Sequence, residues 1–230
     1  AGVKVAAVVD ARARLSDVAA AAAESGTRVL IGSAVAATGA DADGRLDTVT
    51  IRSINDDGEL TSGIEEIACD LLAVSGGWSP LVHLHSQRQG KLRWDEDLAA
   101  FVPSTVVPNQ QTIGSGRGSF ELGDCLAEGV SAGAAAAIAA GFAPDNSTAV
   151  AVPLVLDEPK ASAATRQLWL VPGQEGTADD WHQHFVDFQR DQSVADVLRS
   201  TGAGLRSVEH IKRYTSISTA NDQGKTSGVN

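Results

Sequence analysis

Two glycine-containing tracts hold the residues best suited to bring the backbone close to a ligand. Residues 112–120 read TIGSGRGSF and include Gly114, Gly116 and Arg117, directly before a small-residue stretch that predicts a helix over 121–140. Glycines permit close backbone approach, and the N–H groups at a helix start bind anions. Because the spacing is not a strict GxGxxG, tight packing of an Ala/Gly helix against a sheet is an equal alternative.

The second tract contains Gly76 and Gly77. Residues 71–74 (LLAV) predict a buried strand that leads directly into SGGWSP. Open α/β sheets bind ligands outside the carboxyl ends of their strands, so these glycines are predicted to approach a ligand. Asp10 ends another apolar run, residues 3–9, at the position where an acid in a Rossmann sheet binds a ribose hydroxyl. A capping or solvated aspartate is the alternative there.

A third group of residues lies near the end of the chain. It combines cations with hydroxyl donors in an otherwise acidic sequence, which is the combination that holds a phosphate. A solvated basic face is the alternative reading of the same residues. They are Lys212, Arg213, Thr215, Lys225 and Thr226.

No pattern in the sequence supports hydrolysis or a metal site. Cys69 and Cys125 lie far apart in apolar or helical contexts, which predicts two buried thiols rather than a disulfide framework or a metal site. Two histidine pairs have a spacing of two, but two ligands alone do not make a metal site. The pairs are His83 with His85 and His182 with His184. We therefore predict no catalytic residue and no metal ligand in this chain.

The elements that must position these residues begin with a strand–helix–strand unit. The apolar run 3–9 predicts a strand, Ser16 caps a helix that ends near Gly26, and residues 28–35 predict a second strand. Residues 46–52 alternate as a half-solvated antiparallel strand does. The predicted fold class is therefore α/β, with part of a Rossmann-like dinucleotide-binding domain.

The C-terminal part has a helical pattern. Ser193 and Ser207 each precede a short predicted helix, at 194–199 and 208–214. Four prolines fall in the region between this part and the α/β part. We predict a dinucleotide domain over 1–142, a connector over 143–183 and a small helical domain over 184–230.

The composition limits the partners of this chain. A formal net charge of -11 and a pI near 4.8 oppose binding to nucleic acid or to an anionic membrane, because phosphates are repelled. No apolar run approaches the roughly 18 residues of a membrane span, and the N-terminal residues are not typical of a signal peptide. We expect a cytoplasmic setting. Since the chain contains no methionine, we expect position 1 not to be the start of the gene.

The first part of the chain resembles the pyridine-nucleotide-disulfide oxidoreductases. Residues 67–80 are similar to the strand through which that family returns to its flavin domain, and residues 114–133 are similar to its last flavin-contacting strand and helix. Arg117 stands where the family has an aspartate that binds the ribityl chain. A guanidinium cannot accept that hydrogen bond, which favours NAD over a flavin in this domain.

Over essentially its whole length the chain resembles the alpha subunit of heterotetrameric sarcosine oxidases. The stretches that carry this resemblance are FVDFQRD at 185–191, GLRSVEHIKRYT at 204–215 and DQGKTS at 222–227. The last part also resembles, more remotely, small BFD-type [2Fe-2S] domains. Their four cysteine positions hold Asp187, Gln189, Asp222 and Ser227 here, and without thiolates no iron-sulfur cluster is expected.

The resemblance implies a cofactor and a partner for each predicted site. It implies NAD at Asp10, the Gly76–Gly77 pair and the 114–117 turn. It implies a beta subunit that carries FMN and the amine site, besides other small subunits, with the flavin phosphate on the basic residues at 212–215 and 225–226.

The resemblance also implies an activity for the complete enzyme, which is the oxidative demethylation of sarcosine to glycine with transfer of the one-carbon unit to tetrahydrofolate. The Gly-rich first turn of each dinucleotide half is not found in the sequence, so we expect an internal fragment that is inactive alone. A non-catalytic scaffold or binding module of oxidoreductase ancestry is the alternative.

Overall fold

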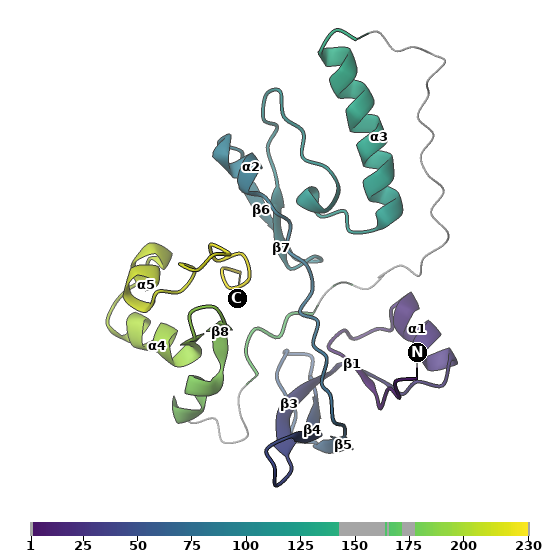
Figure 1. Cartoon of the computed structure of the whole chain (residues 1–230), viewed down its shortest axis with the longest axis vertical. Helices are drawn as coiled ribbons and strands as arrows, with labels where there is room; N and C mark the ends of the chain where they lie inside the picture. Colours follow the sequence, from purple (N-terminus) through teal and green to yellow (C-terminus); the bar gives the residue numbers. More distant parts are fainter. Residues whose placement is uncertain (1, 143–163, 165, 172–177, 230) are drawn as a thin grey trace. The chain divides into compact units, whose positions relative to one another are not determined.

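The computed structural model describes residues 2–142, 164, 166–171 and 178–229 (Figure 1). The chain is mixed α/β and divides into two compact units. Unit 1 comprises residues 1–33 and 71–167, and unit 2 comprises residues 34–70 and 168–230. Most of the predicted connector, 143–183, lies outside the described residues, and the predicted domain boundaries stay predictions.

The predicted strand–helix–strand unit is present at the start of the chain. β1 (Val8–Asp10) pairs in parallel with β2 (Val29–Ile31), and α1 (Asp17–Glu24) connects them. The Ser16 hydroxyl accepts the Ala19 N–H at 3.2 Å, which confirms the predicted cap. Both strands are shorter than predicted.

A three-stranded sheet follows in the order β3-β4-β5. Its strands are β3 (Ser33–Ala40), β4 (Leu46–Ser53) and β5 (Glu65–Ala68), and β4 pairs antiparallel with β5. The antiparallel strand predicted at 46–52 is confirmed, but its alternation is not, because Thr50 is buried together with Val49 and Ile51. The predicted strand over 28–35 was wrong as a single element, because the chain changes direction at Gly32, where φ is +57°.

The predicted strand at 71–74 is absent from the structure. Residues 71–82 follow β5 without regular secondary structure, and Leu71 and Val74 are 72% and 83% exposed. A strand of this apolar composition is stable only between two neighbours in a sheet. Among the described residues no strand pairs with it, so the local composition alone does not form the element.

The middle of unit 1 is a hairpin with a short helix before it. α2 (His83–Gln87) precedes β6 (Leu92–Asp95), which pairs antiparallel with β7 (Ala100–Pro103). Across the hairpin, the rings of Trp94 and Phe101 meet edge to face, 5.0 Å apart. The side chains of Ala100 and Val102 are buried and form the small core of this region.

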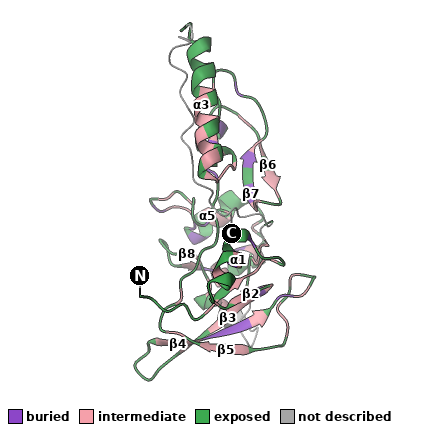
Figure 2. Cartoon of the chain, turned by 90° about the vertical axis from the view of Figure 1, so that its right-hand side faces the viewer, coloured by how far each residue is buried: buried purple, intermediate pink, exposed green. Residues whose placement is uncertain are grey.

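α3 (Leu122–Ala139) confirms the helix predicted over 121–140. It follows the 3₁₀ turn η1 (Gly114–Arg117), which lies where the glycine-rich turn was predicted. Figure 2 shows that the C-terminal half of α3 is exposed. In the described part of the chain, α3 is one helix that is long and apolar enough to cross a membrane, by length and composition alone. The expectation that no apolar run has this length was therefore wrong. The many alanines of Leu122–Ala139 give these 18 residues a mean hydropathy of 1.2.

The C-terminal part of unit 2 contains both predicted helices, together with an antiparallel pair of short strands, β8 and β9, that was not predicted. Ser193 caps α4 in a reciprocal box in which the Asp196 carboxylate accepts the Ser193 N–H, whereas Ser207 precedes α5 without a side-chain cap bond. The elements are η2 (Ala178–Gln183), β8 (Phe185–Asp187), β9 (Gln192–Ser193), α4 (Val194–Gly202) and α5 (Val208–Thr215).

Candidate functional site

The glycine-rich turn η1 is tied to α3 by a carboxylate. The Gly114 N–H donates to Glu128 Oε2 at 2.7 Å, and the Ser119 hydroxyl donates to Glu128 Oε1 at 2.6 Å. Gly114 is buried and has a φ of +58°, a conformation that favours glycine. The backbone donor that was predicted to face a phosphate therefore already binds an anion from the same chain.

The same hydrogen bonds set the charge state of Glu128. The Ser119 hydroxyl and then the Gly114 N–H lower the pKa of Glu128 below its usual value, against an opposing effect of burial. The nearby Arg117 guanidinium lowers this pKa further. Glu128 is thus ionised at neutral pH and acts as a fixed anion under the turn.

Replacing Glu128 with glutamine is expected to lower the free energy of unfolding by about 1–2 kcal/mol at pH 7, because two donors lose a charged acceptor. A depressed carboxyl pKa contributes stability above the unfolded-state value, near 4.5, and that stability is lost as the pH falls through the folded-state pKa. The difference between the two proteins should therefore shrink below about pH 4.5.

Urea unfolding from pH 3 to pH 7 measures this difference. Glu121→Gln is the matched control, because Glu121 precedes the same helix and makes no side-chain cap bond. Parallel pH profiles for wild type and Glu128→Gln would show that the carboxylate does not brace the turn.

The other predicted residues of this turn have different surroundings. A Cβ at Gly116 would lie 3.1 Å from Thr112 Cγ2, which supports close packing as the reason for this glycine. Arg117 is exposed and remains accessible to an anion in solution. Gly118, which sequence reasoning did not single out, has a φ of +99°, and a Cβ there would lie 2.6 Å from Leu98 Cδ1.

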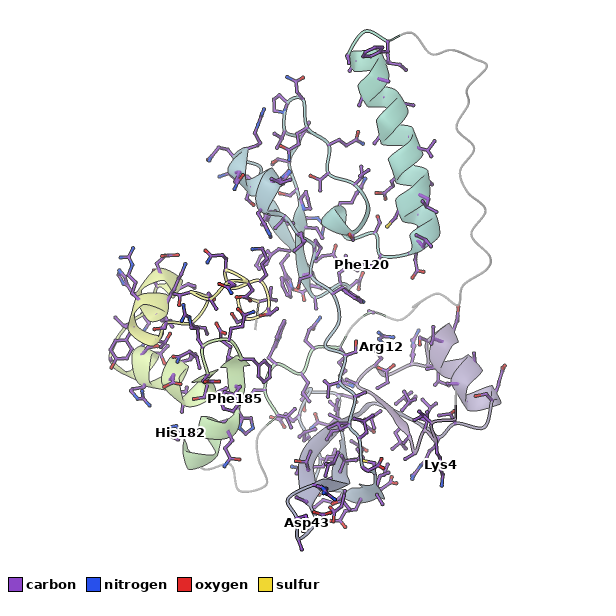
Figure 3. All side chains as sticks on the ribbon, viewed as in Figure 1. Lys4, Arg12, Asp43, Phe120, His182 and Phe185 are labelled. Carbon is purple, nitrogen blue, oxygen red and sulfur yellow. The ribbon has the colours of Figure 1, made fainter. Side chains whose placement is uncertain are left out.

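Asp10 lies at the carboxyl end of β1, as predicted. Its Oδ1 accepts the Arg12 N–H at 2.9 Å, and its Oδ2 lies 3.8 Å from the Arg12 guanidinium, whose residue is labelled in Figure 3. Gly76 and Gly77 lie in the irregular segment 71–82. A Cβ at either position would meet nothing within 4 Å, and Gly77 has a φ of +95°. The backbone at these glycines is accessible.

A cavity of about 610 Å³ lies between α2 and the segment that leads into η1. The Arg88 guanidinium is held beside it by the Pro108 carbonyl at 3.1 Å. His85 is buried, with its Nε2 3.2 Å from the Lys91 carbonyl oxygen. Sequence reasoning missed this cavity, although three glutamines flank the two segments. The lining residues are Leu81, Leu84, His85, Gln87, Arg88, Gln110, Gln111, Thr112 and Ile113.

Unit 2 contains a second internal carboxylate, Asp187, at which three loops meet. Asp187 is 1% exposed. Its Oδ1 accepts the N–H groups of Gln189 (3.0 Å) and Arg190 (3.1 Å). Its Oδ2 accepts the Ser218 N–H at 2.8 Å and the Ser227 hydroxyl at 3.4 Å. One side chain thus joins the turn after β8 to the loops at 216–219 and 225–227.

Asp222 organises the loop that carries two of the predicted phosphate ligands. Its Oδ2 accepts the Thr226 hydroxyl at 2.5 Å and the Thr226 N–H at 3.1 Å, and these bonds lower the pKa of Asp222. Lys225 Nζ donates to the Asp222 carbonyl at 3.0 Å and is exposed. The donors of Thr226 are therefore engaged by an internal anion, whereas the Lys225 ammonium is accessible.

The remaining predicted phosphate ligands lie on α5. Arg213 is exposed and Lys212 is half-buried. Thr215 is buried, and its hydroxyl donates to the Ile211 carbonyl at 2.8 Å and accepts the Ile217 N–H at 3.3 Å. Its hydroxyl thus stabilises the helix end.

The predicted residues divide between the two units. Asp10, Gly76, Gly77 and the 114–117 turn lie in unit 1, and the basic residues lie in unit 2. In the described ranges no group of three or more His, Cys, Asp or Glu side chains is arranged to hold a metal ion. Cys69 and Cys125 are both free thiols but only half-buried, so the prediction that both are buried was wrong.

The fold is similar to that in the crystal structure of L-proline dehydrogenase from P. horikoshii. The match has a TM-score of 0.53 and 16% sequence identity, and it covers 95% of this chain and 41% of that chain. At this identity the likeness shows the fold alone.

Sequence comparison identifies the family. Residues 181–230 match the family model of the sarcosine oxidase A3 domain. The chain is 52% identical over 226 residues to the sarcosine oxidase subunit alpha of Corynebacterium sp. strain P-1, and 53% identical over 226 residues to that of strain U-96. Each match covers 98% of this chain and 23% of the relative. The subunit alpha of Rhizobium meliloti strain 1021 is 34% identical over 166 residues, which is 72% of this chain and 16% of the relative.

The chain therefore belongs to the sarcosine oxidase subunit alpha family, which confirms the resemblance found in the sequence. It spans about a quarter of the length of the curated relatives that it matches.

Proposed function

We propose that this chain is a non-catalytic part of the alpha subunit of a heterotetrameric, cytoplasmic sarcosine oxidase. In the complete enzyme, sarcosine is oxidatively demethylated to glycine and the one-carbon unit passes to tetrahydrofolate. The observation that carries the proposal is the identity of about half of the residues to sarcosine oxidase alpha subunits over nearly the whole chain. The chain supplies dinucleotide binding and a face for the flavin-bearing beta subunit.

Unit 1 is proposed to bind the NAD of the alpha subunit. Asp10, at the end of a parallel strand, supplies a carboxylate for ribose hydroxyls, and the accessible backbone at Gly76 and Gly77 permits close approach. The Gly114 N–H is not free to donate to a phosphate while it donates to the Glu128 carboxylate. Arg117 is the exposed cation of this turn and is the residue proposed to face the NAD phosphates.

Residues 184–230 are proposed to form a BFD-like domain without an iron-sulfur cluster. Asp187 and Ser227 occupy two of the four positions that hold cysteines in that fold. Both are buried, and Ser227 Oγ lies 3.4 Å from Asp187 Oδ2. This convergence supports the likeness. The oxygen atoms at these positions form hydrogen bonds with each other and with the backbone instead of binding iron.

The basic residues of unit 2 are proposed to bind the FMN phosphate at the interface with the beta subunit. Lys225 and Arg213 are exposed cations, and Lys212 is half-exposed on the same helix as Arg213. Such side chains suit a phosphate dianion. The flavin, when bound, supplies the electron acceptor for amine oxidation, and these residues hold its phosphate group.

Exchange of Lys225 for alanine in the complex with the beta subunit is expected to weaken FMN binding about tenfold or more, because a charge-assisted hydrogen bond is lost. Lys212→Ala should have a smaller effect, since this side chain is only partly accessible. Flavin release followed by fluorescence measures both. If the variant that carries both Lys212→Ala and Lys225→Ala retains flavin as wild type does, these residues are not the phosphate site. The NAD site proposed for unit 1 is tested separately, by equilibrium dialysis of the complex against NAD.

A second candidate is a scaffold of oxidoreductase ancestry that binds no nucleotide. It is favoured by one observation, that Glu128 and Asp222 already accept donors that were predicted to face phosphates. If the complex binds neither NAD nor FMN through this chain, while the subunits still assemble, the scaffold is the correct function.

A further inference from the structure

The cavity beside α2 has an apolar side chain on each of the two segments that form it. Leu84 belongs to α2, and Ile113 belongs to the segment that leads into η1. The cavity volume of about 610 Å³ is within the range of roughly 300–1,000 Å³ that is usual for small-molecule sites. Leu84 is 73% exposed, so a flat ring placed between Leu84 and Ile113 would remove apolar surface from water.

Carboxamide groups line the same cavity from both segments. Gln87 belongs to α2, and Gln110 and Gln111 precede η1. A carboxamide presents a donor and an acceptor side by side, which is the arrangement that pairs with the amine edge of adenine. The polar part of the lining therefore suits an uncharged nitrogen heterocycle.

His85 offers one further acceptor to the cavity. It is 4% exposed, and its Nε2 lies 3.2 Å from the Lys91 carbonyl oxygen. A carbonyl can only accept, so Nε2 carries the proton and Nδ1 holds the lone pair of the neutral ring. Among the described residues no group donates to Nδ1, and no polar side-chain atom is both buried and without a partner. Nδ1 is therefore open to the cavity that His85 lines, where it can accept a ligand N–H.

The charge of the lining favours an anion. Arg88 is exposed at the end of α2, and its Nη2 donates to the Pro108 carbonyl at 3.1 Å. The other N–H groups of the guanidinium remain for a phosphate. None of the described residues that line the cavity is an aspartate or a glutamate, so an ammonium group would lack a counter-charge there.

The packing around the cavity holds its lining in place. A Cβ at Gly90 would overlap the His85 ring, which packs against that glycine. A Cβ at Gly116 would lie 3.1 Å from Thr112 Cγ2, so the lining residue Thr112 packs on η1. A site whose side chains are already ordered loses less conformational entropy on binding.

We propose that this cavity binds a purine nucleoside monophosphate with an exocyclic amine, for which adenosine monophosphate (AMP) is the probe. The base lies between Leu84 and Ile113, its amine donates to His85 Nδ1, and the phosphate binds Arg88. None of the residues proposed above for NAD lines this cavity, so the inference goes beyond the proposed function. Two sources supply the same chemical group, a free nucleotide and the adenine half of NAD, and the test separates them.

The test is the affinity of the complete oxidase complex for AMP, measured by isothermal titration calorimetry. Arg88→Ala is expected to weaken binding about tenfold or more with an unchanged melting temperature, because a charge-assisted hydrogen bond is lost. Arg14→Ala is the matched control, because Arg14 is exposed in the same unit and does not line the cavity. Inosine monophosphate lacks the exocyclic amine and should bind about tenfold more weakly than AMP, since His85 Nδ1 loses its donor.

Titration of AMP into the complex saturated with NAD identifies the source of the nucleotide. If AMP still binds, the cavity takes a free nucleotide. If NAD excludes AMP and Arg88→Ala weakens both ligands equally, the cavity takes the adenine half of NAD.

Three results would overturn the inference. They are equal affinity of wild type and Arg88→Ala for AMP, no binding of AMP at millimolar concentration, and exclusion of AMP by NAD while Arg88→Ala leaves the affinity for NAD unchanged. In the last case AMP occupies the NAD site proposed for the other residues of unit 1. Each of these results leaves the proposed function standing, because dialysis against NAD tests that function separately.

Discussion

Asp187→Ala is expected to lower the free energy of unfolding of the C-terminal part by about 3 kcal/mol, because three backbone N–H groups and a serine hydroxyl lose their acceptor at once. Asp187 is 1% exposed, so water cannot fully replace the carboxylate. The loops at 216–219 and 225–227 would lose their common attachment. Asp187→Asn should cost about 2 kcal/mol, since its amide group turns a donor toward other donors.

Urea unfolding combined with hydrogen exchange of residues 181–229 measures this effect and assigns it to the correct part of the chain. Asp191→Asn is the matched control, because Asp191 is exposed and its φ of +50° suits asparagine. We expect the control to stay within about 0.5 kcal/mol of wild type. Equal stability of Asp187→Asn and Asp191→Asn would mean that Asp187 is not the residue that joins the three loops.

Gly224→Ala is expected to destabilise the same part by about 2–4 kcal/mol, for two separate reasons. Gly224 has a φ of +78°, which an L-residue adopts at a cost. A Cβ there would also lie 2.5 Å from Ser218 Cβ, so the 216–219 loop would have to move away from Asp187.

Gly44→Ala separates the two causes. Gly44 also has a φ of +78°, but a Cβ there would meet nothing within 4 Å. Its substitution should therefore cost only the conformational part, about 1 kcal/mol. Thermal unfolding of both variants gives the difference, and equal losses would show that Gly224 is needed for its backbone angle alone.

Elements that local signals define could be predicted from the sequence. The Ser16 cap defined α1, the Ser193 cap defined α4, and the Ala/Gly composition of residues 121–140 defined α3. The strand at 71–74 could not be predicted in this way, because a buried parallel strand depends on its neighbours as much as on its own residues. Its apolar composition is real, but among the described residues nothing pairs with it.

The candidate sites were harder to predict because their main contacts span long distances in the sequence. Glu128 and Gly114 are 14 residues apart, and Asp187 reaches Ser218 and Ser227 across 31 and 40 residues. Spacing rules cover one or two turns of a helix and cannot reveal such pairs.

The carboxylate under the glycine-rich turn has a consequence for ligand affinity. Glu128 is tethered to the turn that it binds, so its effective concentration at the Gly114 N–H exceeds that of any free phosphate in solution. A phosphate that used this donor would have to compete with a resident side chain, and its apparent affinity would be its intrinsic affinity multiplied by the fraction of time that the turn is vacant. Glu128 would thereby act as a built-in competitive inhibitor that selects against free anions and spares ligands that bind chiefly through their sugar and base.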